Sequence, residues 1–332
     1  MSNTKKVVLI VTGVALVCLI GAGIILGISY TQASRDGHDV SNFFGLFSGS
    51  RVTVEETHEL KLDGISALSV ECASGNVTVQ PGTEAKVEMT GSLWTPEQKD
   101  EYISVTQEGE RLNVKLDIDS TFFNWVDIDI VVTIPEDSGL NLNVAAASAN
   151  TVMQQLTLGD VSIGCASGKV EINDVTGGAL DVGTASGVVR VANSEFTSIR
   201  TNCQSGDIDI RDTKAPATVH CTSGRVNITD VTGALDISNT SGGVTVDLSQ
   251  KDIEPIKVNV TSGTLNVYLN GEAAFDLYAS TTSGGIHCDF DRLVSGNGGG
   301  SIVGDKISGE CNGGGVSVTL ETVSGGINIK KK

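Results

Sequence analysis

The sequence predicts an all-β protein: a single-stacked parallel β-solenoid with a less regular N-terminal β cap, preceded by one transmembrane helix. Three observations predict this fold. The pattern apolar-x-apolar-x-small-x-Ser-Gly-x-apolar-x-apolar occurs ten times, and successive serines in its regular part lie 18 to 21 residues apart. Apolar and polar residues alternate within each copy, which together with a fixed period near 20 is typical of stacked β coils. A 22-residue apolar run stands near the N-terminus.

The apolar run covers residues 7–28 (VVLIVTGVALVCLIGAGIILGI) and contains no charge. A helix of this length spans the ~30 Å hydrocarbon core of a bilayer. Lys5 and Lys6 precede the run and acidic residues follow it, so the positive-inside rule predicts a cytoplasmic tail at 1–6 and an extracytoplasmic location after the helix. We therefore expect a single-pass protein of the cell membrane. A signal peptide cleaved near residues 31–33 is the alternative.

Residues 29–50 are predicted to form a juxtamembrane linker, and residues 51–145 an irregular β cap with the first coils. Phe43, Phe44 and Phe47 would lie either at the membrane surface or over the open end of the first coil. The strand candidates of the cap are Leu60–Leu62, Ala67–Cys72, Asn76–Val79, Lys86–Thr90, Ile103–Gln107, Leu112–Ile118 and Val126–Ile134.

The regular solenoid is predicted at residues 146–329. Apolar residues recur six and four positions before each serine and three and five positions after it. Strands stack about 4.8 Å apart, so each position becomes a column of like residues facing the interior. The pattern is disturbed at Ser148-Ala149, where the apolar residue arrives one place late at Val152, and this predicts a distorted first coil or a different register.

The ten serines share the parity of the inward positions. We therefore expect them to lie inside the corner, where a small hydroxyl fits and is hydrogen-bonded, and to be structural. A large residue at Ser205 is then predicted to destabilise the fold strongly. The glycine after each serine would allow the backbone to turn the corner.

A Gly-rich stretch at residues 295–315 separates the last two copies of the repeat. It predicts a long flexible insertion before a terminal coil that closes the stack. Lys330, Lys331 and Lys332 follow this coil and would protect an exposed final edge against further stacking.

Four cysteines stand two positions before a serine, in a column of small side chains: Cys72, Cys165, Cys203 and Cys221. Buried cysteine behaves as a small hydrophobe. Cys203 and Cys221 lie on adjacent coils, near enough for a disulfide, but parallel side chains in one column favour free thiols.

Composition and motifs give no catalytic, cofactor-binding or metal-binding residues. The net charge of −18 argues against nucleic acid as a partner. The pairs Asp117/Asp119, Asp127/Asp129 and Asp207/Asp209 lack the Gly-rich calcium repeat, so alternating outward Asp is favoured over a calcium site. Glu171, Arg190 and Asp209 occupy the same outward position on three successive coils, where opposite charges would support the register rather than form the carboxylate cluster of a glycan-cleaving enzyme.

Two segments carry a resemblance to a known family. VDIDIVVTIPEDSGLNLNVAAAS (126–148) and ETVSGGINI (321–329) resemble the strand-Pro-strand entry and the closing coil of the bacterial putative-adhesin family of Ser-Gly β-strand-repeat proteins, over about residues 60–329. The resemblance implies a membrane-anchored β-solenoid and no enzymatic activity.

We therefore expect a non-enzymatic, adhesin-like binding or structural module at the cell surface. Its partners would be the membrane, through the N-terminal helix, and a cell-envelope polymer or protein; no cofactor is expected. The alternative is an extracytoplasmic envelope-stress sensor or modulator that acts with a membrane partner, because residues 1–6 are too few to signal alone. A glycan-active enzyme is the third and least favoured hypothesis.

Overall fold

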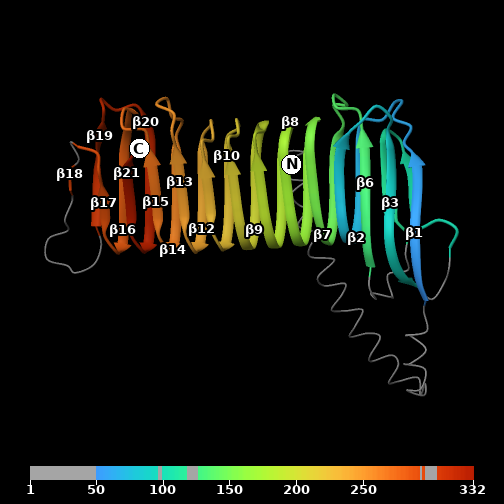
Figure 1. Cartoon of the computed structure of the whole chain (residues 1–332). Helices are drawn as coiled ribbons and strands as arrows, with labels where there is room; N and C mark the ends of the chain where they lie inside the picture. The colour runs from blue at the N-terminus through green and yellow to red at the C-terminus, as the bar shows by residue number, and fades with distance from the viewer. Residues whose placement is uncertain (1–49, 96–98, 118–125, 292–293, 296–304) are drawn as a thin grey trace, which may run out of the picture.

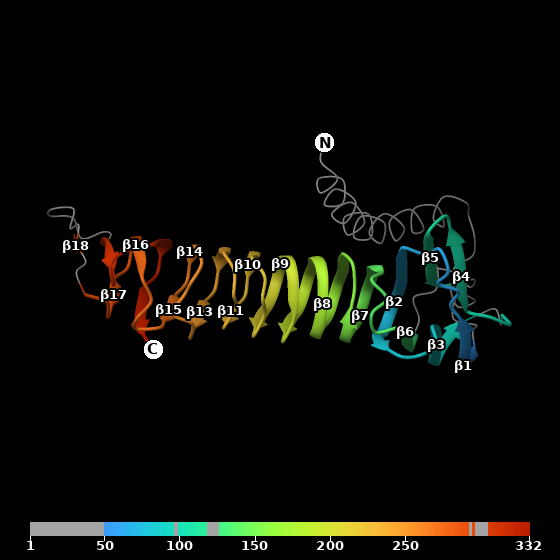
Figure 2. The same ribbon diagram turned by 90° about the horizontal axis from the view of Figure 1, so that it is seen from above.

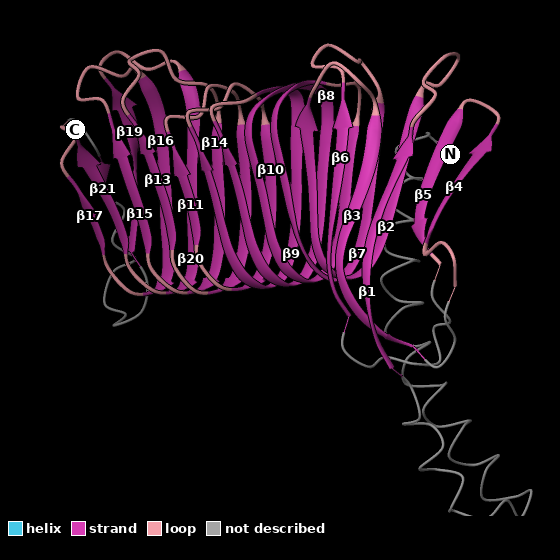
Figure 3. Cartoon of the chain, turned by 45° about the vertical axis from the view of Figure 1, so that its right-hand side comes forward, coloured by secondary structure: helices cyan, strands magenta, loops and turns pink. Residues whose placement is uncertain are grey.

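The computed structural model describes residues 50–95, 99–117, 126–291, 294–295 and 305–332, and every regular element in these ranges is a β-strand (Figure 3). The described part contains no helix that could span a bilayer. The predicted helix 7–28 and linker up to residue 49 lie outside the described residues.

The strands lie side by side in one long stack (Figure 1). Four long strands run through the Ser-Gly corner: β2 (Ala67–Pro81), β7 (Asn141–Thr157), β8 (Val161–Ala192) and β9 (Glu195–Arg211). In later coils each side of the corner is a separate strand. The strands before the serine are β10 (Ala217–Ser223), β12 (Leu235–Ser241), β14 (Ile256–Ser262), β16 (Phe275–Ser283) and β20 (Val316–Ser324). The strands after it are β11 (Val226–Thr229), β13 (Val244–Leu248), β15 (Leu265–Leu269), β17 (Ile286–Cys288) and β21 (Ile327–Lys331).

Neighbouring coils pair in parallel, and each serine faces a serine of the next coil. Ser205 is the register partner of Ser223, which is the partner of Ser241. The strands before the serines form one layer of the stack and the strands after them form a second sheet opposite it (Figure 2). The apolar columns of both sheets are buried between them. The parallel solenoid predicted from the repeat is the observed architecture of this part of the chain.

The coil at Ser148 is in regular register, contrary to the predicted distortion. Ser148 pairs with both Ser74 and Ser167, and Thr151 pairs with Val77 and Val170. Thr151 therefore occupies the inward column three positions after the serine, and its side chain is fully buried. Val152 points outward. The apolar residue comes one place late in the sequence because a threonine occupies a position that is apolar in the neighbouring coils.

A short third side closes the middle coils. Seven residues after the serine, five successive coils have a residue with φ between 47° and 55°: Gln155, Asp174, Asn193, Asp212 and Asp230. Asp and Asn tolerate this left-handed conformation better than other residues with a Cβ. The chain then turns and buries Val175, Phe196, Ala215 and Val231 under the open side of the two sheets.

The N-terminal cap consists of two sheets that diverge from β2. β5 (Arg111–Leu116) and β4 (Ile103–Glu108) extend its first half, while β6 (Val126–Ile134), β3 (Lys86–Thr95) and β1 (Ser50–Glu59) extend its second half. The Glu56 carboxylate accepts the backbone N–H groups of Tyr102 and Ile103 at 2.8 and 2.9 Å, which joins the two outer strands. The strand predicted at Leu60–Leu62 is wrong: β1 ends at Glu59.

The order of coils at the C-terminal end differs from the order in sequence. β20 and β21 pair with β14 and β15 on one side and with β16 and β17 on the other. The last coil of the sequence therefore lies between two coils that are consecutive in sequence. The prediction that residues 316–329 close the stack is wrong.

The stack ends instead at β19 (Asp305–Cys311), which pairs antiparallel with β16 and with β18 (Val294–Ser295). β19 lies within the stretch 295–315 predicted as a flexible insertion, so this part of it is a covering strand; residues 296–304 lie outside the described residues. The terminal lysines do not protect a final edge. Lys331 pairs with Asp291 at 3.3 Å, and Lys332 binds Asp247 and Ser249 of an interior coil.

Candidate functional site

The corner of each coil is formed by backbone packed on backbone. A Cβ built on Gly206 would overlap the carbonyl oxygen of Gly187, and one built on Gly224 would overlap that of Gly206. Gly206 also has φ of 151°, which L side chains rarely adopt. The close approach of successive coils therefore requires glycine at these corners, whereas the coil of Ser148 has Ala149 at the corresponding position.

The serines lie outside this corner, and the prediction that they face inward is wrong. In β10, β12 and β14 the last buried residue stands two positions before the serine, and both following residues are exposed. The alternation of inward and outward side chains therefore ends at the serine, one residue before the glycine. The serine hydroxyl points to solvent because the bend turns it away from the interior.

The ten serines form one row along the stack. In spatial order they are Ser74, Ser148, Ser167, Ser186, Ser205, Ser223, Ser241, Ser262, Ser324 and Ser283. None of their hydroxyl groups has a hydrogen-bond partner among the described residues. A second row of exposed side chains, one position before the serine, includes Thr222, Thr240 and Thr261. The corner therefore presents free hydroxyl groups at about 4.8 Å intervals.

The predicted column of small side chains is observed two positions before the serines, and its four cysteines are buried free thiols. The thiol of Cys165 donates to the carbonyl of Ser167 at 3.1 Å, and Asn239 Nδ2 donates to the carbonyl of Gly224 at 3.1 Å. Thr281 Oγ1 donates to the carbonyl of Gly325 at 3.0 Å. Three members of the column thus donate to carbonyls of the corner, a role that side-chain size alone did not indicate, whereas Ala146 and Val260 at the same position have no donor.

Cys203 and Cys221 are register partners on adjacent strands. Their hydrogen bond, together with burial, raises the pKa of Cys203 well above the ordinary range of a thiol. Burial likewise raises the pKa of Cys72 and Cys165. The hydrogen bond between Cys203 and Cys221 lowers the pKa of Cys221. Because the thiolate is the reactive form, Cys72, Cys165 and Cys203 are poor nucleophiles in the folded protein.

The outer face of the second sheet carries the predicted charge row. Arg190 Nη1 lies 3.5 Å from Glu171 Oε1, and Asp209 is the register partner of Arg190 without an ion pair to it. The Lys169 side chain, hydrogen-bonded to Glu171, lowers the pKa of that carboxyl, and Arg190 adds to this. These exposed pairs support the register and contribute little stability individually.

In each Asp-x-Asp pair, one carboxylate contacts a side chain elsewhere in the chain. Asp117 binds Lys99 at 2.9 Å, Asp129 accepts from Asn76 at 2.6 Å, and Asp207 binds Arg225 at 2.8 Å; Asp119 lies outside the described residues. No group of three metal-ligating side chains occurs in the described ranges.

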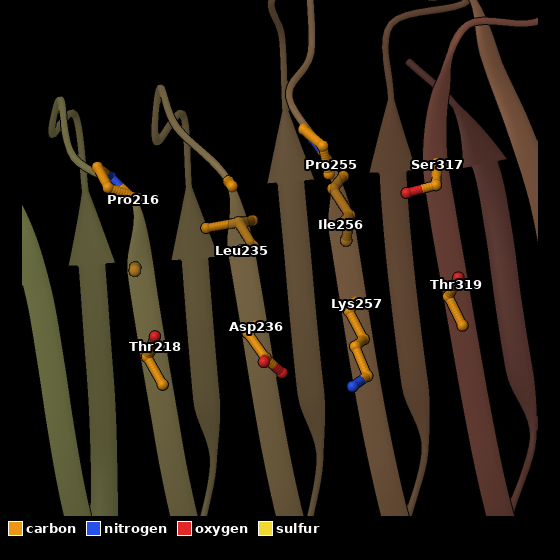
Figure 4. Close-up of a pocket in the computed structure, with 11 residues that line it drawn as sticks. Pro216, Thr218, Leu235, Asp236, Pro255, Ile256, Lys257, Ser317 and Thr319 are labelled. Carbon is orange, nitrogen blue, oxygen red and sulfur yellow. The ribbon is translucent and has the colours of Figure 1, made fainter.

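A shallow groove of about 260 Å³ crosses the outer face of the first sheet, over β10, β12, β14 and β20 (Figure 4). Pro216 and Pro255 stand at its rim, and Thr218, Asp236, Lys257 and Thr319 lie along neighbouring strands within it. Asp236 and Lys257 are exposed register partners, and neither takes part in an ion pair within the described part of the chain. The groove therefore holds one acidic and one basic side chain, and both can bind a ligand or a partner.

A family model described as Toastrack DUF4097 matches residues 65–224 and again residues 213–330. The chain belongs to the Toastrack family. The two matches cover the stack and most of the cap, from just before β2 into β21. No curated protein matches the chain.

Solved structures similar to this Toastrack protein include putative adhesins from Bacteroides fragilis and Parabacteroides distasonis. They are 12% and 11% identical to the chain, cover 84% and 85% of it and 98% and 97% of their own length, and have TM-scores of 0.43 and 0.41. A putative lipid binding protein from Parabacteroides distasonis is 12% identical, with 84% and 97% coverage and a TM-score of 0.44. At these scores the family assignment depends on the family model alone.

Proposed function

We propose that this Toastrack protein is a non-enzymatic, adhesin-like module that binds a repetitive cell-envelope polymer along its serine row. The observation that carries the proposal is the set of hydroxyl groups at one corner, in register and without partners in the described chain. A polymer whose polar groups repeat at a similar interval would meet a hydroxyl group on successive coils. Many weak contacts would then add along one ligand chain.

The proposed location is outside the cytoplasm, with the chain anchored by residues 7–28. The positive-inside arrangement of Lys5 and Lys6 supports this orientation. A rigid stack of parallel coils suits such a location, since each coil contacts only its neighbours and the whole length remains open to a large ligand.

Sedimentation with insoluble cell-wall polysaccharide tests the proposal. The full chain, purified in a non-ionic detergent, is expected to sediment with the polymer. Ser223→Ala/Ser241→Ala should weaken retention without loss of stability, because both hydroxyl groups are exposed and unpartnered. The matched control is Asn227→Ala/Thr245→Ala, on the second sheet of the same two coils.

Equal retention of the two double variants would contradict a role for the serine row. Failure of the unmodified chain to sediment, with recovery of a membrane protein instead, would favour the alternative function, an envelope-stress sensor or modulator.

A further inference from the structure

The outer face of the first sheet carries an ordered row of charges five positions before the serines. In spatial order its central members are Asp181, Arg200, Thr218, Asp236 and Lys257, each the register partner of the next. The chain as a whole has a net charge of −18, whereas this row contains two acids and two bases. The charges of this row therefore balance one another locally.

The four charged side chains of this row form no ion pair among the described residues, although Asp181 is half-buried and the charge of Arg200 acts on it. Charged residues elsewhere do pair across neighbouring coils: Asp207 with Arg225, Glu195 with Lys214, and Lys251 with Glu272. Arg200, Asp236 and Lys257 are exposed. These charges are therefore available to a partner that offers opposite charges at the same spacing.

The order of charges is antisymmetric about Thr218. One strand away on either side stand Arg200 and Asp236, and two strands away stand Asp181 and Lys257. A twofold axis parallel to the strands and passing over Thr218 would place a second copy face to face with the first, with its order of coils reversed. Each row of one copy would then lie opposite the same row of the other copy. Asp181 would then face the partner's Lys257, and Arg200 would face the partner's Asp236.

We propose that a second copy of this chain docks on this face, with the two stacks antiparallel and Thr218 on the twofold axis. Such an interface is isologous, since every contact occurs twice. In the row three positions before the serines, Asn202 would face the partner's Ser238, and Gly183 would face the partner's Asn259. His220 lies on the axis in this row and would face the partner's His220. The groove at Asp236 and Lys257 would receive the partner's Arg200 and Asp181.

The area is sufficient for a specific contact. Seven strands at about 4.8 Å and six residues at about 3.3 Å give a face that buries about 1,300 Å² in total. Specific interfaces begin at about 1,000 Å². Without a large apolar centre, the dimer is expected to depend on its four ion pairs and to weaken as salt is added.

Sedimentation equilibrium of the full chain in non-ionic detergent tests the dimer. We expect a reversible dimer, and at least about a tenfold rise in its dissociation constant for Arg200→Asp or Asp236→Arg, because each places like charges together. An equimolar mixture of these two variants should restore dimerisation, because each ion pair can then form between an acid of one variant and a base of the other. Arg200 and Asp236 of one chain are separated by β10, so a contact within one chain would not produce this rescue in trans.

Arg190→Asp is the matched control, because it makes the same change on the second sheet and should leave dimerisation unaltered. Thr218→Cys gives an independent readout: a short bis-maleimide should link two copies through this residue, whereas Thr245→Cys on the second sheet should link none above the unmodified protein. A monomer at every concentration, or variants that stay dissociated when mixed, would overturn the proposal.

Discussion

The carbonyl oxygen of Gly187 occupies the space that a Cβ on Gly206 would need. The same relationship recurs between Gly206 and Gly224 and between Gly242 and Gly263, so the corner from Gly168 to Gly263 is a continuous column of backbone. The side chains beside it, the serines, are consequently pushed to the outside.

Gly206→Ala is expected to destabilise the protein by about 2–4 kcal/mol, because the backbone must shift and the residue keeps a positive φ. Gly164→Ala is the control, since a Cβ at Gly164 meets no atom within 4 Å. Chemical denaturation of the two variants measures the difference. Equal midpoints would show that the coils can separate at the corner without cost.

Ser205→Leu is expected to change the free energy of unfolding by less than about 0.5 kcal/mol, as is usual at exposed positions. This reverses the prediction made from sequence parity. Cys221→Leu, two positions before the next serine, should cost about 1–3 kcal/mol because it overfills the buried column. Thermal denaturation of both variants distinguishes outward serine from inward cysteine.

Thr151→Val is expected to stabilise the protein by about 1 kcal/mol. The Thr151 hydroxyl is buried and has no hydrogen-bond partner, and its column neighbours are Val77 and Val170. Valine has nearly the same shape and removes the unsatisfied group. A lower denaturation midpoint for this variant would mean that the hydroxyl has a partner in solution.

Arg225→Gln should make stability less dependent on acid pH. The Arg225 hydrogen bond lowers the pKa of Asp207 below its ordinary value of 3.8, so the stabilising contribution is present above that value and is lost as the pH falls through the folded pKa. The variant should therefore be less stable than the unmodified protein at neutral pH, and the difference should vanish below the folded pKa. NMR titration of Asp207 in both proteins gives the shift directly.

The apolar columns could be predicted from the sequence because inward residues repeat at fixed positions. The order of coils could not. Val318 pairs with Ile256 on one side and Leu277 on the other, and these residues would fit equally well against each other. Identical columns make coils interchangeable neighbours, so their order depends on the connections between them rather than on the repeat.

The serine orientation was missed for a related reason. Parity assigns the interior to alternate residues only while the strand continues, and Cys203 is the last inward residue before the bend at Ser205. The signal available in the sequence was the residue before the serine, which is often threonine. Thr222, Thr240 and Thr261 are as polar as the serines, and adjacent polar residues indicate that alternation has ended.

β20 and β21 lie between two coils that precede them in the sequence, and this has a consequence for synthesis. The ribosome releases β16 and β17 before the strands that join them to β15, so they leave the exit tunnel with no complete partner on that side. The gap closes only after residues 316–331 have been synthesised. A nascent chain arrested before residue 316 would therefore lack the coil that separates β14 and β15 from β16 and β17.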